Sequence, residues 1–176
     1  MIPTGTPIDA LTGGLAAKTI TLIYGPTGCG KTTLCIKLIN NFLEKGYRAI
    51  YIDTEGNVVE DMFIDSEKVN ILYARSLGEQ TKIIKRLPEM ALGFAKNIIV
   101  VDTMTGHFHR QVLAAPDAYR AAKAGALSGK LVAQLATLKA SLRGESVAVV
   151  TAHLRSPVGD AFRESEARKV AGLIQK

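Results

Sequence analysis

The sequence has little cysteine and no long apolar run. Its two cysteines, Cys29 and Cys35, lie six positions apart, which fits neither a disulfide framework nor a zinc site. Reduced thiols are the default in the cytoplasm, where we expect this protein. No run of 18 or more apolar residues occurs, so we expect no membrane span. The first 14 residues lack the charged and apolar regions of a secretory signal, so we expect none.

Acidic residues are scarce in the second half of the chain. Residues 1–102 carry 11 Lys/Arg and 11 Asp/Glu, whereas residues 103–176 carry 11 Lys/Arg and 5 Asp/Glu, which accounts for the net charge of +6. A basic half indicates either a polyanion partner or a soluble basic surface, and charge alone does not decide. With 176 residues, 47% of them hydrophobic, the chain fits one compact domain spanning 1–176.

Apolar runs and helical stripes alternate along the chain. The predicted strands are 19–24, 48–53, 69–74, 97–102 and 147–152. The predicted helices are 31–45, 79–96 and 119 to about 143. Pro88 is expected to kink or break the second helix, and Gly125 and Gly129 can break the third. Strands without polar alternation are buried on both faces, so we predict the α/β class, with a mostly parallel sheet flanked by helices.

The octapeptide GPTGCGKT, residues 25–32, matches the phosphate-loop pattern G-x-x-x-x-G-K-[ST]. It follows a predicted strand and opens a predicted helix, and these flanks disfavour a glycine turn with a chance lysine. Backbone N–H groups and the helix N-terminus would hold phosphates, Lys31 would reach the β- and γ-phosphates, and Thr32 would bind Mg²⁺. The predicted nucleotide-binding residues are Gly25, Pro26, Thr27, Gly28, Cys29, Gly30, Lys31, Thr32 and Thr33.

Two carboxylates at predicted strand ends are candidates for the chemistry. Asp102 ends a buried strand, where an acidic residue either caps a turn or holds Mg²⁺ through water. With a phosphate loop upstream, we favour the magnesium role. Glu55 lies two residues beyond the strand that ends at Asp53. At that edge it is either an exposed loop residue or the group that activates the attacking water, and position alone leaves both open.

Five segments together resemble the RecA-like recombinases, in particular the archaeal RadA/RadB group and its short paralogues. They are PTGTPIDALTGGL (3–15), YIDTEG (51–56), VVDTMTGHFHR (100–110), SGKLVAQLATLKASL (128–142) and VAVVTAHL (147–154). The resemblance implies a P-loop NTPase with a RecA-like sheet in which the Glu55 strand lies beside the Asp102 strand. It also implies that Glu55 is the water-activating base.

The resemblance further implies two DNA-facing loops, after Arg110 and after His153. The family carries a γ-phosphate-sensing glutamine at the position of His153, where histidine is still a hydrogen-bond donor. A strand-end histidine bonded to the backbone is the alternative. The predicted DNA contacts, which could instead be arginine fingers for a neighbouring subunit, are Arg110, Arg120, Lys123, Arg155, Arg163, Arg168 and Lys169.

Other positions carry weaker signals. Cys29 within the phosphate loop is either a redox switch or a variable loop position, and we favour the latter. Cys35 is expected in the core. His107 and His109 lack a third ligand and do not make a metal site. We expect this protein to lack two features of the family, an N-terminal helix-hairpin-helix module and an oligomerisation segment, which would favour an accessory paralogue. The C-terminal strands are expected to be short or missing.

The sequence therefore predicts a weakly hydrolysing, DNA-dependent ATPase that uses ATP and Mg²⁺ and acts in recombination and repair. Its expected partners are single-stranded DNA, a recombinase or another RecA-like paralogue, and a second copy across the ATP interface. Catalysis is assigned to Glu55, Lys31 and His153. The rivals are a KaiC-type regulatory ATPase without DNA binding, a small-molecule kinase, for which no acceptor lid is evident, and an adaptor that binds ATP without hydrolysis.

Overall fold

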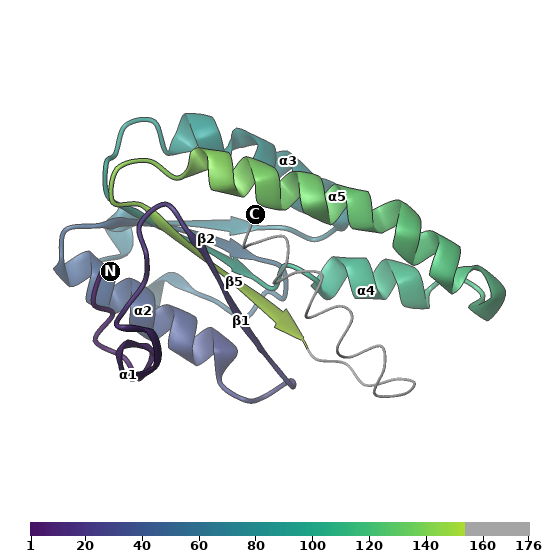
Figure 1. The fold of residues 1–176 in the computed structure, drawn as a ribbon, viewed down its shortest axis with the longest axis horizontal. Coiled ribbons are helices and arrows are strands. Elements are labelled where there is room, and N and C mark those ends of the chain that lie inside the picture. The colour runs from purple at the N-terminus through teal and green to yellow at the C-terminus, as the bar shows by residue number, and fades with distance from the viewer. Residues whose placement is uncertain (154–176) are drawn as a thin grey trace.

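The computed structural model describes residues 1–153, which form an α/β sandwich around one parallel sheet (Figure 1). The strands of this part of the chain are β1 (Ile20–Gly25), β2 (Arg48–Asp53), β3 (Val69–Tyr73), β4 (Asn97–Asp102) and β5 (Val147–His153). Their order across the sheet is β1-β5-β4-β2-β3, with every pair parallel. The predicted α/β class is confirmed, and each predicted strand agrees with the observed one to within a residue at either end.

Helices cover both faces of the sheet. They are α1 (Ile8–Thr12), α2 (Lys31–Glu44), α3 (Leu77–Met90), α4 (Gly106–Leu113) and α5 (Arg120–Ser141), with short 3₁₀ turns η1 (Glu60–Met62), η2 (Ser66–Lys68) and η3 (Asp117–Tyr119). In Figure 1, α2 lies on one face, α3 and α5 lie side by side on the other, and α4 lies beyond the carboxyl end of the strands. None of the helices in the described range is long and apolar enough to span a membrane.

The core consists of two apolar layers that share the strands. On β4, Ile98 and Val100 pack in the layer under α2, while Ile99 and Val101 pack in the layer under α3 and α5. Successive side chains of a strand point to opposite faces. A central strand covered on both faces must therefore be apolar throughout, as the sequence pattern of β4 indicated. Cys35, which faces this core from α2, is fully buried as predicted.

The helices differ from the prediction in three respects. Helix α3 starts at Leu77, after the Ser76 cap, and ends at Met90. It passes through Pro88 in its last turn, so the chain does not break there, and a kink at Pro88 stays a prediction. Helix α5 is continuous through Gly125 and Gly129, because its apolar side chains pack on the sheet and on α3. Helices α1 and α4 were not predicted.

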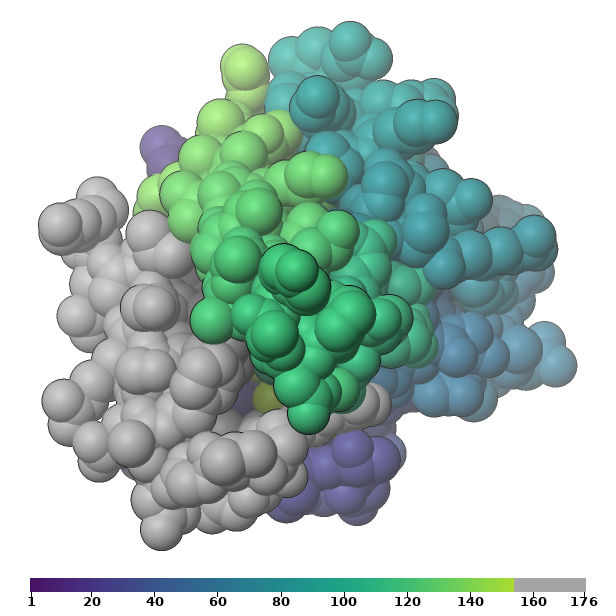
Figure 2. Space-filling model, turned by 90° about the vertical axis from the view of Figure 1, so that its right-hand side faces the viewer, coloured from purple at the N-terminus to yellow at the C-terminus, as the bar shows by residue number. Residues whose placement is uncertain are grey.

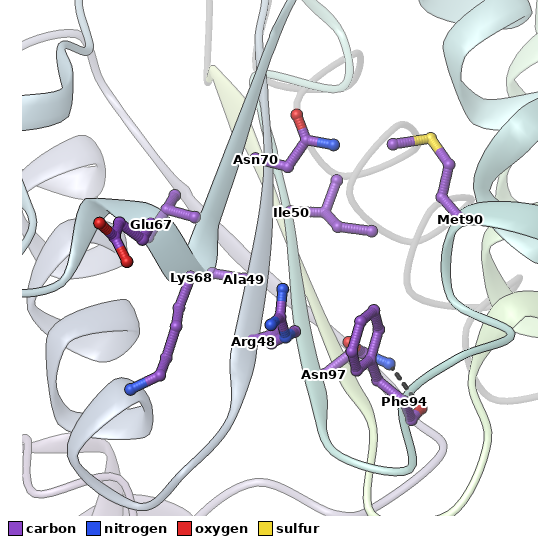
Figure 3. Close-up of a pocket in the computed structure, with 10 residues that line it drawn as sticks. Arg48, Ala49, Ile50, Glu67, Lys68, Asn70, Met90, Phe94 and Asn97 are labelled. Carbon is purple, nitrogen blue, oxygen red and sulfur yellow. Dashed lines mark hydrogen bonds between the residues drawn. The ribbon is translucent and has the colours of Figure 1, made fainter.

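The two ends of the sheet have different character. The carboxyl ends carry the phosphate loop, with Asp53 paired to Asp102 in register and Gly25 paired to His153. The amino ends of β2, β3 and β4 border a cavity of about 340 Å³, where Arg48 lies against the Phe94 ring and Lys68 points outward (Figure 3). This cavity is at the opposite end from the phosphate loop, so it is not part of the nucleotide site.

Candidate nucleotide-binding site

The phosphate loop connects β1 to α2 and requires glycine at several positions. Gly28 and Gly30 have φ of 80° and 88°, in the left-handed region that L side chains rarely adopt. A Cβ on Gly25 would lie 2.7 Å from the Cys29 sulfur. Helix α2 begins at Lys31, directly after Gly30. The free N–H groups of its first turn therefore face the loop, where an anion is favoured.

Lys31 is buried, and no carboxylate within residues 1–153 pairs with it. Its side chain donates to the carbonyl oxygens of Gly25 at 3.1 Å and Pro26 at 2.8 Å. Among the described residues no salt bridge involves Lys31, which is only 6% exposed. Lys31 Nζ also lies 3.9 Å from the Cys29 sulfur. A buried cation held by neutral partners fits an anionic ligand, because a phosphate would supply the missing charge. The loop therefore suits a nucleotide phosphate chain.

Asp102 is the centre of a buried network of hydroxyl groups. Its Oδ2 accepts hydrogen bonds from Thr32 at 2.6 Å and from Tyr51 at 2.7 Å, and its Oδ1 accepts one from Thr151. Burial, followed by the charge of Asp102, raises the pKa of Tyr51, so the phenol stays neutral and donates.

This network bears on magnesium binding. The Thr32 hydroxyl and the Asp102 carboxylate, predicted as the metal residues, lie within hydrogen-bond distance of each other. Within the described part of the chain no group of three His, Cys, Asp or Glu side chains could hold a metal. The pair formed by Thr32 and Asp102 fits Mg²⁺, which takes one or two protein ligands and completes its shell with water and phosphate oxygens. Sequence reasoning missed Tyr51 and Thr151; their signal is a hydroxyl within an otherwise apolar strand.

Glu55 lies in a turn whose backbone is held by its neighbours. Both oxygens of Asp53 accept backbone N–H groups, from Glu55 and Gly56 at 2.8 Å and from Val58 at 3.0 Å. Thr54 is bonded to the end of β4, through its N–H to Asp102 O and through its hydroxyl to the Thr103 backbone. The predicted adjacency of the Glu55 and Asp102 strands is confirmed by the pairing of β2 with β4. Asp53 thus holds this turn.

His153 connects Glu55 to the phosphate loop. Its Nε2 donates to Glu55 Oε1 at 2.5 Å, and its Nδ1 lies 3.4 Å from the Thr27 hydroxyl. The His153 side chain is 8% exposed and that of Glu55 is 27% exposed. The alternative of a backbone-bonded histidine does not describe these contacts. Three of the predicted site elements, Glu55, His153 and the phosphate loop, thus meet at one edge of the sheet.

Three of the seven predicted DNA contacts, Arg110, Arg120 and Lys123, lie among the described residues. Arg110, on α4, donates to the Thr54 carbonyl at 3.2 Å and to His107 Nδ1 at 2.8 Å. Arg120 pairs with Asp117 at 2.8 Å. Lys123 is exposed on α5. Figure 2 views the carboxyl end of the sheet, with α4 and the start of α5 (green) above the purple segment that holds the phosphate loop. The other four predicted contacts, Arg155, Arg163, Arg168 and Lys169, lie outside the described residues.

Comparison with known proteins identifies relatives of this chain. A family described as an ATPase domain predominantly from Archaea matches residues 12–151. The DNA repair and recombination protein RadB of Archaeoglobus fulgidus is 31% identical over 158 residues, which cover 85% of this chain and 68% of that protein. RadB of Methanococcus maripaludis strain C7 is 50% identical over 76 residues, and RadA of Aeropyrum pernix is 33% identical over 121 residues.

The chain is shorter than these relatives. The matched segments span 33% of the Methanococcus RadB, 38% of the Aeropyrum RadA and 68% of the Archaeoglobus RadB. The family match covers most of the present chain, including the phosphate loop, Glu55 and Asp102. Together with the parallel sheet and its phosphate loop, this match shows that the chain belongs to the archaeal RecA-like ATPases of the RadA/RadB type.

Proposed function

We propose that this chain binds ATP–Mg²⁺, hydrolyses ATP slowly, and acts in DNA recombination and repair by engaging single-stranded DNA or a recombinase partner. The observation that carries the proposal is the convergence of Glu55 and His153 on the phosphate loop, next to the Thr32–Asp102 pair. The names of the RadB and RadA relatives support the role in recombination and repair.

In the proposed reaction, Lys31 leaves the carbonyl oxygens of Gly25 and Pro26 and binds the β- and γ-phosphates. Thr32 and Asp102 would hold Mg²⁺, which would neutralise charge on the phosphates. Glu55 orients the water and accepts its proton as the water oxygen attacks the γ-phosphorus. The bond from the γ-phosphorus to the β–γ bridging oxygen breaks, which gives ADP and phosphate. Turnover is slow because no arginine finger is supplied to the isolated chain.

His153 is proposed to sense the γ-phosphate. Its two ring nitrogens face Glu55 and Thr27. A γ-phosphate near Thr27 would compete for the Nδ1 contact and shift the imidazole, together with the segment that follows β5. The histidine thereby takes the part that glutamine has in the family.

Charge on the second half of the chain supports nucleic-acid binding, and two contacts favour a rival. The excess of basic residues lies in residues 103–176, and such charge gives salt-sensitive phosphate contacts. However, Arg110 and Arg120 are engaged within the chain. These contacts favour the second candidate, a KaiC-type regulatory ATPase that acts through protein partners without DNA.

The test is ATP hydrolysis by Glu55→Gln, with and without single-stranded DNA. We expect hydrolysis to fall about a hundredfold or more while ATP affinity stays within about twofold, since the amide still fills the site but cannot accept a proton. Glu60→Gln, the same change on an exposed glutamate five residues along, is the matched control and should retain full activity.

The outcomes separate the candidates. Stimulation of the wild type by DNA, with DNA affinity that falls steeply as salt rises, supports the recombination role. Hydrolysis that is indifferent to DNA, with no binding at low salt, supports the regulatory ATPase. Equal activity of Glu55→Gln and the wild type would refute Glu55 as the base, and a wild type that binds ATP without turnover would make the chain an adaptor.

A further inference from the structure

Helix α4 is attached to the turn that carries Glu55. Arg110, in the second turn of α4, donates from its Nη2 to the carbonyl oxygen of Thr54 at 3.2 Å. Thr54 directly precedes Glu55, and its carbonyl belongs to the peptide unit that joins the two residues. The guanidinium group thus fixes the orientation of the peptide on the N-terminal side of the proposed base.

The same nitrogen of the guanidinium group also contacts His107. Arg110 Nη2 lies 2.8 Å from His107 Nδ1, and His107 Nε2 lies 2.7 Å from the carbonyl oxygen of Ala74, just beyond β3. An arginine only donates and a carbonyl only accepts. His107 must therefore be neutral, with its proton on Nε2 and a lone pair on Nδ1.

The surroundings of His107 favour this neutral form. The residue is 5% exposed. Burial is the largest cause that lowers its pKa, and the Arg110 charge lowers it further, whereas the Ala74 carbonyl and the Glu79 charge oppose the shift. The contacts form one chain, from Ala74 through His107 and Arg110 to Thr54, which connects the ends of β3 and β2 through α4.

We propose that Arg110 is a positioning residue for Glu55 and that neutral His107 holds its guanidinium group in place; this rests on the proposed role of Glu55 as the base. The peptide unit that joins Thr54 to Glu55 is then fixed at two points. Asp53 holds the N–H groups of Glu55 and Gly56, and Arg110 holds the Thr54 carbonyl. Loss of the second point frees that peptide unit to rotate, which displaces the carboxylate from the attacking water.

The placement also gives α4 a direct effect on hydrolysis. Helix α4 ends at Leu113, and the segment that follows it is where a first DNA-facing loop is expected. A partner that shifts α4 would move Arg110 and, with it, the Thr54 carbonyl. The side chain that the sequence assigned to DNA therefore acts on the base, and stimulation by a partner would be transmitted through this contact.

Arg110→Lys tests the positioning role without removing charge. Lysine keeps the charge, but its side chain is one bond shorter, so its ammonium nitrogen does not reach the position of Arg110 Nη2 between Thr54 O and His107 Nδ1. We expect kcat measured without DNA to fall about tenfold or more, with KM for ATP within about twofold, because displacement of a catalytic group costs rate without weakening phosphate binding.

The control is Arg86→Lys on the exposed surface of α3, which should match the wild type. A kcat for Arg110→Lys equal to that of the control overturns the proposal, as does a loss that comes with raised KM and a lowered melting temperature.

Two substitutions of His107 separate hydrogen bonding from packing. Glutamine can accept from Arg110 and donate to the Ala74 carbonyl, whereas leucine fills similar space and does neither. We expect His107→Gln to keep most of the wild-type kcat and His107→Leu to lose as much as Arg110→Lys. Equal values for the two variants, at equal stability, would show that His107 has no orienting role.

Amide hydrogen exchange keeps this inference distinct from the proposed function. If the wild type hydrolyses no ATP, the ATPase proposal fails. The exchange rate of the Glu55 and Gly56 amides then shows separately whether Arg110 holds the turn. Faster exchange in Arg110→Lys than in Arg86→Lys supports a turn held by Arg110. Equal exchange overturns it.

Discussion

Tyr51→Phe tests whether the buried hydroxyl network around Asp102 stabilises the fold. Tyr51 is fully buried, and its hydroxyl donates to Asp102 Oδ2 at 2.7 Å. The substitution removes this donor and leaves the carboxylate with Thr32 and Thr151. Because only one oxygen is deleted, the ring keeps its packing under α2, and the loss measures the hydrogen bond.

The expected magnitude follows from the charge and burial of the acceptor. A hydrogen bond to a charged group contributes about 1.5–3 kcal/mol. For a domain of this length, 1 kcal/mol corresponds to a shift in melting temperature of about 2–4 °C. We therefore expect Tyr51→Phe to lower the melting temperature by about 3–12 °C, without nucleotide or Mg²⁺.

Tyr47→Phe is the matched control for this measurement. Tyr47 is also buried, but its hydroxyl donates at 3.2 Å to Glu145, whose side chain is 57% exposed. Solvent competes for that carboxylate, so loss of the hydrogen bond from Tyr47 is expected to cost no more than about 1 kcal/mol. Urea denaturation of both variants gives the comparison. If Tyr51→Phe costs no more than Tyr47→Phe, the reasoning that Asp102 depends on buried donors is refuted.

Two further predictions concern the N-terminal segment and pH. A Cβ on Gly14, where φ is 114°, would lie 2.3 Å from the Ile2 carbonyl oxygen, so Gly14→Ala should cost at least about 2 kcal/mol. Gly13→Ala, with open space around the Cβ, should cost less in the same denaturation assay; an equal cost contradicts the steric reason. The folded-state pKa of His107 lies below its ordinary value of 6.5, so the unfolded chain takes up this proton first as pH falls. The contribution of neutral His107 to the free energy of unfolding is thus present above about pH 6.5 and is lost as pH falls through the folded-state pKa. His107→Gln should therefore show a flatter profile of stability against pH between about pH 8 and 5. Parallel profiles for this variant and the wild type would contradict this.

The strands and the phosphate loop were predictable because local sequence determines them. A strand buried on both faces has no polar positions, as in β4, and glycine spacing defines the loop. The helices were less predictable because packing overrides propensity. Pro88 is tolerated since it lies in the last turn of α3, where Leu87 is fully buried. Helix α4 is eight residues long and polar, so it has no long periodicity, and Phe108 fixes it by packing near Leu127 of α5.

In the candidate site, residue type was predictable and partners were not. The pattern identified Lys31 and Thr32, but the contacts of Arg110 depend on where α4 lies, which no local pattern sets. Charge suggested DNA for Arg110, whereas burial of His107 beside it created a local acceptor. A buried acceptor close to an arginine outcompetes solvent, because leaving either group unpaired is costly.

The two aspartates that end neighbouring strands also show that residue type is predictable from the sequence while hydrogen-bond partners are not. Asp53 and Asp102 are register partners on β2 and β4, and both were visible in the sequence as strand-end carboxylates. Asp53 uses its oxygens on three backbone N–H groups that follow it, so it fixes the Glu55 turn. Asp102 accepts side-chain hydroxyls from three different elements, Thr32 of α2 among them. A hydroxyl can be exchanged for a metal ion, whereas a backbone N–H cannot be released without unfolding the turn. The available partners, rather than the residue type or the position on the strand, therefore favour Asp102 for magnesium and Asp53 for structure.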